Sequence, residues 1–378
     1  MLSKLPQTGT SIFSIMTQMA NEYGAINLSQ GFPGFDVSPE LTELVNFYMK
    51  KGLNQYAPMP GVPQLRKKIA DKINAAHGID VDTNHNITIT AGATQGIYTC
   101  ITAIVHPGDE VIYFEPAYDS YKPGILLNGG VPVTVSLSAP DFTIPWEEVR
   151  NKITERTKLI IINTPHNPSG SIIDSHDLEE LTQIANEHDL FVLSDEVYEH
   201  IVFDNKEHFS VLRSPGLKDR HMAVFSFGKT FHATGWKVGY VVAPQQLMNE
   251  IIRLHQYMLF SVNTPIQYAL AEYLENEENY LGLPDFYQEK RDYFLNLMKS
   301  SRLKALDCSG TYFQTFSYGH ISDEGDMEMA AKLTKEHGVA SIPISAFYEN
   351  GHNDHLLRFC FAKEKEELKQ AAEILCKI

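Results

Sequence analysis

The chain has 378 residues, of which 43% are apolar and 21% are charged, and its formal net charge is −16. This length is more than one hydrophobic core usually serves, so we expect two lobes. The negative charge argues against nonspecific nucleic-acid binding, and no apolar run approaches the roughly 18 residues that span a membrane.

The cysteines are four and lie far apart, with no CxxC pair. This spacing is typical of neither a disulfide framework nor a metal site. The N-terminal stretch also lacks the pattern of a secretory signal. We therefore expect reduced cysteines, no metal and a location in the cytoplasm.

Short apolar runs alternate with helical patterns in the middle of the chain. The runs begin at Asn86, Glu110, Val131, Lys158, Leu190, His221 and Val238. Several are continuously apolar, as strands covered on both faces are. This alternation predicts an α/β fold with a doubly wound, mainly parallel seven-stranded sheet, whose ligands bind at the carboxyl ends of the strands.

The pattern changes after about residue 265, where long helical stretches lead to a few short apolar runs. This part indicates a second, smaller α+β lobe. The first 40 residues have too little pattern to fold alone. We therefore predict a large α/β domain at residues 41–268, and a small α+β domain made of residues 1–40 and 269–378.

The first polar site in chain order is a strand, a turn of small residues and a helix, "ITAGATQGIYTCITAIV". The amides of Ala93 and Thr94 at the helix N-terminus would form an anion site. The turn is not GxGxxG, so a dinucleotide site is weakly supported. Tyr118 follows the next strand, where its ring either stacks on a flat cofactor or has a plain packing role.

Two later strands also end in polar residues. In "IIINTPHNPSG" two prolines stiffen the turn around Asn167, which is either a positioned hydrogen-bond donor or part of an ordinary Asn-Pro turn. Asp195 ends another apolar run, where a carboxylate is costly unless paired. It suits the protonated nitrogen of a pyridine ring, with Tyr198 at a ring oxygen; the alternative is a helix N-cap.

The stretch "SFGKTFHATGWKVGY" follows a further strand and carries two lysines among small residues. Lys229 lies just past the strand end, where a desolvated amine could form a Schiff base with an aldehyde. Ser226 and Lys237 would then bracket a phosphate, although both lysines could equally be surface charges. A GxxxxGK[ST] nucleotide loop is excluded because it needs glycine where the chain has Ala223.

These strand ends together supply an amine, a carboxylate, a phenol, an amide, an aromatic ring and an anion cradle. One cofactor fits that set, pyridoxal 5′-phosphate, which accepts electrons from a substrate that is bound to it.

Over nearly its whole length the sequence resembles the fold-type-I, class I/II pyridoxal-phosphate-dependent aminotransferases. It is most similar to the branch that contains methionine aminotransferase and kynurenine–oxoglutarate aminotransferase. The motifs that carry the resemblance are "INLSQGFPGF", "NQYAPMPGVPQLR", "AGATQGIY", "EPAYDSY", "NTPHNPSG", "SDEVYEH", "SFGKTFHATGWKVGY", "GTYF" and "LLRFCFA".

The resemblance implies a role for each matching residue. Lys229 bonds to the cofactor and then moves the proton between substrate and cofactor. The other cofactor-binding residues are Asp195 at the ring nitrogen, Tyr198 and Asn167 at the ring oxygen, Tyr118 on the ring, and Ala93, Thr94, Ser226 and Lys237 at the phosphate. Many relatives have arginine in place of Lys237, so the geometry at the phosphate can differ.

The resemblance also implies substrate contacts and a partner. Arg358 binds the substrate α-carboxylate, with Gly31 beside it and with Tyr118 and Asn167 close to the substrate. A strand-edge charge is the alternative for Arg358. Tyr56 would reach the phosphate of a partner subunit, which implies a homodimer.

We find no second arginine for an acidic side chain, and the candidate pocket residues Phe13, Ile15 and Phe347 are apolar. We therefore expect transamination, by ping-pong kinetics, from methionine, aromatic or other uncharged L-amino acids to a 2-oxo acid. A β-lyase acting on cysteine conjugates or cystathionine would use the same residues. A non-catalytic regulator on this fold is a more distant alternative.

Overall fold

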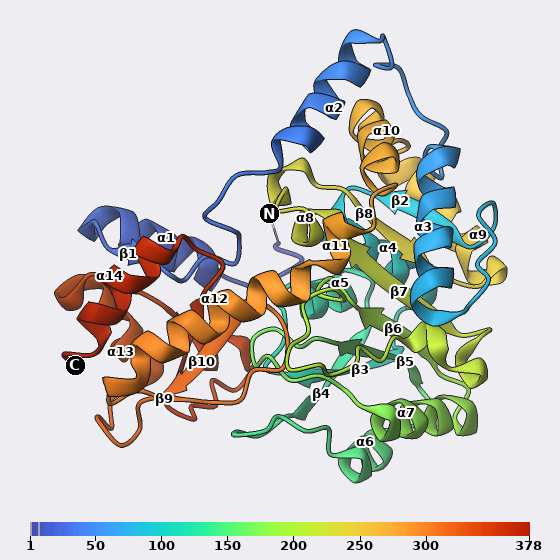
Figure 1. Cartoon of the computed structure of the whole chain (residues 1–378). Coiled ribbons are helices and arrows are strands. Elements are labelled where there is room, and N and C mark those ends of the chain that lie inside the picture. The colour runs from blue at the N-terminus through green and yellow to red at the C-terminus, as the bar shows by residue number, and fades with distance from the viewer. Residues whose placement is uncertain (1, 7) are drawn as a thin grey trace.

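The computed structural model describes residues 2–6 and 8–378. It has a large part built on one wide sheet and a smaller part that contains both ends of the described chain's secondary structure (Figure 1). No helix in the described residues is long and apolar enough to cross a membrane.

The large part is built on seven strands in the order β2-β8-β7-β6-β5-β3-β4. The strands are β2 (Ile87–Thr90), β3 (Glu110–Glu115), β4 (Val131–Ser136), β5 (Thr157–Asn163), β6 (Phe191–Asp195), β7 (His221–Ser226) and β8 (Gly239–Val242). Each falls in one of the apolar runs of the sequence. Only β8 runs antiparallel to its neighbours, so the predicted doubly wound, mainly parallel α/β sheet is confirmed.

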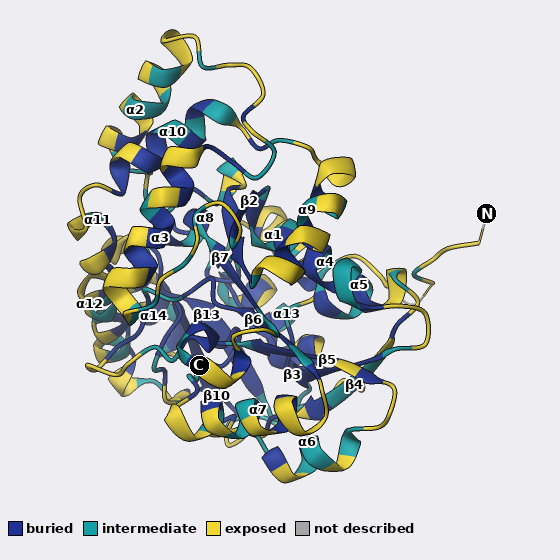
Figure 2. Cartoon of the chain, turned by 90° about the vertical axis from the view of Figure 1, so that its right-hand side faces the viewer, coloured by how far each residue is buried: buried dark blue, intermediate teal, exposed yellow. Residues whose placement is uncertain are grey.

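Helices cover both faces of this sheet. One face packs against α4 (Gly92–Ile104), α5 (Tyr121–Leu127) and α9 (Gln245–Met258). The other packs against α3 (Pro63–His77), α6 (Trp146–Lys152), α7 (Ser175–Glu187) and α10 (Thr264–Tyr273). The strands are buried, whereas the outer faces of α6 and α7 are exposed (Figure 2). Strands buried on both faces explain the continuously apolar runs.

The smaller part has a four-stranded antiparallel sheet in the order β12-β13-β10-β9. Its strands are β9 (Lys304–Ala305), β10 (Phe313–Ser317), β12 (Ile342–Pro343) and β13 (Leu356–Cys360). The helices of this region are α11 (Glu278–Leu281), α12 (Leu283–Leu297), α13 (Asp326–Lys332) and α14 (Lys365–Leu375). This mixture agrees with the predicted α+β lobe.

The N-terminal segment joins this smaller part. It forms α1 (Ile12–Tyr23) and β1 (Ile26–Asn27), and β1 pairs in parallel with β11 (Val339–Ala340). The exact division at residues 40 and 268 stays a prediction. Helix α2 (Pro39–Lys50) packs on α10 through stacked rings of Tyr48 and Tyr268, with centroids 5.4 Å apart.

Candidate active site

A cavity of about 220 Å³ opens at the carboxyl ends of the central strands. Its wall includes every residue to which the resemblance assigns a cofactor or substrate contact, apart from Tyr56. These are Gly31, Ala93, Thr94, Tyr118, Asn167, Asp195, Tyr198, Ser226, Lys229, Lys237 and Arg358. The sheet therefore brings together residues that are far apart in the chain.

Lys229 lies on α8 (Phe227–Thr230), a single turn that begins directly after β7. Ser226 caps this turn by accepting a hydrogen bond from the Lys229 backbone N–H, at 3.4 Å. The Lys229 Nζ donates to the carbonyl of Gly31 at 2.9 Å and to the hydroxyl of Tyr312 at 2.7 Å. Burial lowers the pKa of the amine to about 8, which favours its neutral, nucleophilic form.

Asp195 is the last residue of β6 and is buried. Its Oδ2 accepts a hydrogen bond from the Tyr121 hydroxyl at 2.7 Å, whereas Oδ1 is buried without a hydrogen-bond partner among the described residues. Burial raises the pKa of this carboxyl to about 6. An unpaired buried oxygen is costly, so Oδ1 is suited to accept an N–H from a bound ring.

The backbone at the start of α4 lies unusually close to neighbouring segments. Gly92 has φ +76°, and a Cβ there would lie 3.2 Å from the Lys237 Nζ. A Cβ on Gly239 would lie 2.5 Å from the Phe225 carbonyl oxygen and 3.0 Å from the Ala93 nitrogen. A Cβ at position 239 would collide with the backbone, and the positive φ at position 92 favours glycine, so the two glycines permit these approaches. They place the amides of a helix N-terminus and a lysine amine around one space, which is suited to a phosphate.

Arg358 lies on β13 with its side chain fully buried. It donates from Nη1 to Asn167 Oδ1 at 2.7 Å and from Nη2 to the Ser29 carbonyl at 3.1 Å, and its Nε has no partner among the described residues. Burial lowers its pKa to about 10, so it stays charged at neutral pH. A buried cation with no carboxylate bonded to it is suited to an anionic ligand.

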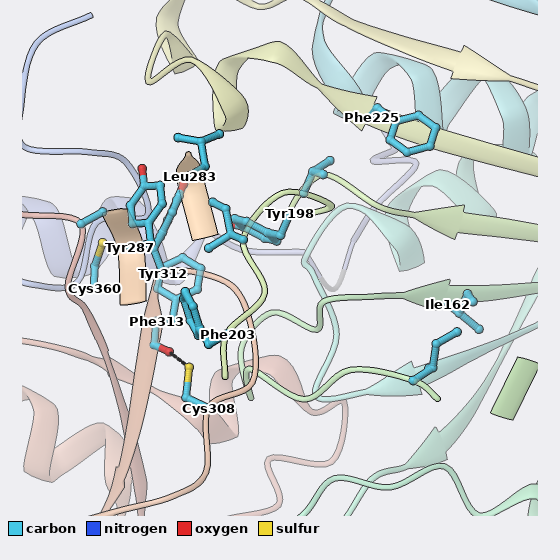
Figure 3. Close-up of a cluster of buried hydrophobic side chains, with 14 of the residues drawn as sticks. Ile162, Tyr198, Phe203, Phe225, Leu283, Tyr287, Cys308, Tyr312, Phe313 and Cys360 are labelled. Carbon is cyan, nitrogen blue, oxygen red and sulfur yellow. Dashed lines mark hydrogen bonds between the residues drawn. The ribbon is translucent and has the colours of Figure 1, made fainter. Parts of the chain in front are cut away.

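Aromatic residues form much of the remaining wall. The Phe313 ring centroid lies 3.8 Å from the Arg358 Cζ, and the Tyr198 ring meets Tyr312 edge to face at 5.2 Å. Figure 3 shows Tyr312, Phe313 and Tyr287 gathered beside Tyr198; of these four, Phe313 and Tyr198 line the cavity. The Tyr118 hydroxyl lies 3.4 Å from the Thr94 hydroxyl, which links the aromatic wall to the anion cradle.

Three sequence predictions lie outside the cavity wall. Tyr56 is 82% exposed and contacts Phe260 edge to face at 5.3 Å. The prediction that Ile15 lines the pocket is wrong, because it lies about 200° around α1 from Phe13, the residue of that helix in the wall. Phe347 is buried behind the wall, against Phe13 and Arg358.

Two site residues had no role assigned from the sequence. Tyr312 lies within the "GTYF" motif, and its hydroxyl donates to the Gly31 carbonyl at 2.6 Å while accepting from Lys229. Tyr121 ends the "EPAYDSY" motif and bonds to Asp195. The signal available from the sequence was that each tyrosine lies in a motif that carries the family resemblance. The hydrogen-bond partner of each hydroxyl is more than 70 residues away in the chain, so the motif does not show the contact.

An amine of lowered pKa, a buried carboxylate and a buried guanidinium around one cavity can bind an amino acid and move its α-proton. The fold and this cavity therefore indicate an α/β enzyme that acts on amino groups. In the described residues no cluster of three or more histidine, cysteine, aspartate or glutamate side chains could hold a metal ion.

The chain belongs to the aminotransferase class I and II family, whose model matches residues 23–375. It is a transaminase, and members of this family use pyridoxal phosphate. The expected family and fold are confirmed.

Individual relatives match almost end to end. The chain is 50% identical to the methionine aminotransferase of Escherichia coli K12, over 99% of this chain and 97% of that one. It is 34% identical to kynurenine–oxoglutarate transaminase 1 of Mus musculus, over 95% and 93% of the two chains. A crystal structure from E. coli, identified as a methionine aminotransferase, superposes with a TM-score of 0.98, covering 100% of this chain and 99% of that one.

Proposed function

We propose that the protein binds pyridoxal 5′-phosphate and transfers the amino group of methionine, aromatic or other uncharged L-amino acids to a 2-oxo acid by ping-pong kinetics. One observation carries this proposal. A single cavity brings the Lys229 amine, the unpaired Asp195 Oδ1 and the buried Arg358 guanidinium together.

The residues present fit the cofactor. Lys229 would hold its aldehyde carbon, and Asp195 would hold its ring nitrogen through Oδ1. The N-terminus of α4 and the Lys237 amine would hold the phosphate in a space that any Cβ on Gly92 would narrow. Other contacts are expected from Ala93, Thr94 and Ser226 at the phosphate, Tyr118 on the ring, and Tyr198 and Asn167 at the ring oxygen.

When bound, the cofactor supplies a ring that accepts the electrons left behind when the substrate loses its α-proton. Lys229 would remove that proton from the substrate and deliver it to the cofactor. This transfer requires a neutral amine, and the lowered pKa of Lys229 raises the neutral fraction near physiological pH. The Gly31 carbonyl and Tyr312 hydroxyl hold the free amine in one place between transfers. Arg358 binds the substrate carboxylate, so the α-carbon is presented to Lys229 in a fixed orientation.

The substrate class follows from the charges and the wall. Among the described residues that line the cavity, the cations are Lys229, Lys237 and Arg358, and each already has a task. No cation remains for an acidic side chain. Phe13, Ile97 and Phe313 offer apolar surface instead, which supports uncharged side chains.

A homodimer is part of the proposal. Tyr56 and Phe260 pack together on the surface while both stay substantially exposed, and Tyr257 is 87% exposed nearby in sequence. Exposed aromatic side chains of this kind support a contact with a second copy, where Tyr56 would reach the partner's phosphate. A cytoplasmic location is supported by four cysteines that are all unpaired.

The test is a kinetic panel of amino-acid donors with one 2-oxo acid, run on the wild-type enzyme and on Lys229→Ala. We expect methionine and aromatic donors to give the highest kcat/KM. We expect the variant to lose both transamination and the visible absorbance of the bound cofactor. Aspartate as the best donor would refute the substrate class, and a variant that keeps its activity and absorbance would refute the role of Lys229. Pyruvate and ammonia release from cysteine conjugates, measured in parallel, separates a β-lyase.

A further inference from the structure

Tyr121 is the first residue of α5 and is buried directly beside two residues of the proposed cofactor site. Its hydroxyl donates to Asp195 Oδ2 at 2.7 Å. Its ring meets that of Tyr118 edge to face, with centroids 5.8 Å apart. Tyr121 is not in the cavity wall, so it acts on a bound ligand only through these neighbours.

The hydrogen bond divides the two oxygens of Asp195 between two tasks. Oδ2 is bonded to Tyr121, which stops the carboxylate from turning freely about its axis. Oδ1 is buried and has no hydrogen-bond partner among the described residues. A fixed carboxylate with one available oxygen presents a single acceptor at a defined point, which favours one position for the N–H that it accepts.

We propose that Tyr121 is a positioning residue that keeps Asp195 ionised and Oδ1 aimed at the cofactor ring, so that the shared proton stays on the ring nitrogen. This inference rests on the proposed function, because it needs a pyridine ring in the cavity. Donation to an oxygen stabilises a carboxylate more than a carboxylic acid. The hydroxyl therefore biases the proton between Asp195 and the ring toward the ring.

Groups on several elements act on the Asp195 carboxyl. Burial raises its pKa, whereas the Tyr121 hydroxyl from α5, the Val197 backbone N–H and Lys229 on α8 lower it, and Glu196 raises it. Within this set the Tyr121 bond is the largest influence that favours the carboxylate.

Tyr121 keeps the proton that it donates throughout the neutral pH range. Burial and the Asp195 charge raise the pKa of its own hydroxyl well above 10, so it keeps its proton. Without this donor, the Asp195 carboxylate would lose the largest of the influences that stabilise its charge. It would then become more basic and would draw the shared proton away from the ring nitrogen.

The test compares Tyr121→Phe with Tyr113→Phe in the full-length enzyme. Tyr113 is a matched control because its hydroxyl, on β3, is buried without a hydrogen-bond partner among the described residues. Each protein is loaded with pyridoxal 5′-phosphate labelled with ¹⁵N in the ring. The ring ¹⁵N chemical shift reports the position of the proton, and fluorescence titration reports the dissociation constant.

We expect wild type and Tyr113→Phe to give the shift of a protonated ring nitrogen. Tyr121→Phe should move the shift toward the unprotonated value and weaken cofactor binding about tenfold, as expected for the loss of a hydrogen bond to a charged group. A Tyr121→Phe variant with the shift and affinity of Tyr113→Phe overturns the proposal. Failure of the wild-type enzyme to bind the cofactor overturns the proposed function instead, so the two failures are distinct.

A double variant keeps the test decisive if Tyr121→Phe does not fold. Adding Asp195→Asn removes the buried charge that Tyr121 is proposed to stabilise. If Tyr121 acts through that charge, the double variant folds even where Tyr121→Phe does not. Where Tyr121→Phe does fold, the same substitution should change cofactor affinity far less in the Asp195→Asn background than in the wild type. A double variant that stays unfolded, or an equal effect in both backgrounds, shows a packing role and overturns the proposal.

Discussion

In the cofactor-free protein, the reactivity of the Lys229 amine should rise and level off at a lower pH than that of an ordinary lysine. Burial lowers the pKa of this amine from 10.5 to about 8. At pH 7 a group with a pKa of 8 is neutral in about one molecule in ten, whereas one with a pKa of 10.5 is neutral in about one in three thousand. At equal intrinsic nucleophilicity, Lys229 should therefore react about 300 times faster than a free lysine.

Trace acetylation followed by mass spectrometry of the Lys229 peptide measures this directly, with N-acetyl-lysine amide as the external standard. Only the neutral amine reacts, so the rate should rise about tenfold per pH unit below 8 and level off above about pH 9. The free standard should keep rising through that range. An inflection at pH 10 or above for Lys229 would refute the reasoning that burial sets its pKa.

The same shift predicts how the stability of the cofactor-free protein depends on pH. The folded state disfavours the charged amine, so between about pH 8 and 10.5 the unfolded chain binds more protons than the folded one. The contribution of Lys229 to the free energy of unfolding therefore rises with pH across this window, by about 3 kcal/mol in total. Urea denaturation at pH 8 and pH 10 of the wild type and of Lys229→Met isolates this contribution.

Two further substitutions test the packing around the site. Gly239→Ala places a Cβ 2.5 Å from the Phe225 carbonyl oxygen. This substitution should lower the free energy of unfolding by about 1–3 kcal/mol and weaken cofactor binding. An unchanged melting temperature would contradict the close approach. Lys72→Met leaves the buried Glu199 carboxylate without the amine that lies 2.5 Å from it, so urea denaturation should show a loss of about 3–5 kcal/mol. Lys67→Met, which removes an exposed i,i+4 pair, is the control and should leave stability nearly unchanged; equal losses in both would show that burial of the pair does not matter.

The strands and most of the cavity residues could be predicted because their signals are local. A buried strand requires a continuous apolar run. A polar side chain buried at the end of such a strand costs desolvation free energy unless it has a partner, so it indicates a binding role. The direction of β8 carried no such signal, since the run from Val238 is equally apolar in either orientation. Ile15 shows a related limit, because apolar character alone does not say which side of a helix a residue occupies.

The supporting tyrosines could not be assigned from sequence because their roles depend on distant partners. Tyr121 reaches Asp195 across 74 positions and Tyr312 reaches Lys229 across 83. Nothing near either tyrosine distinguishes a hydroxyl with a task from one without, as in Tyr113, whose hydroxyl has no partner among the described residues. These contacts arise from the topology of the two sheets, and no local sequence pattern predicts either contact by itself.

The bond between the Ser29 carbonyl and Arg358 joins positions 329 residues apart, which has a consequence for synthesis on the ribosome. At roughly 5–20 residues per second, the N-terminal segment emerges on the order of tens of seconds before the strand that carries Arg358. During that interval β1 and the Gly31 loop have no β11 or β13 to pair with, although the central sheet can already form. We therefore expect the nascent chain to form the proposed phosphate site at the start of α4 well before Arg358 is in place to bind the substrate carboxylate.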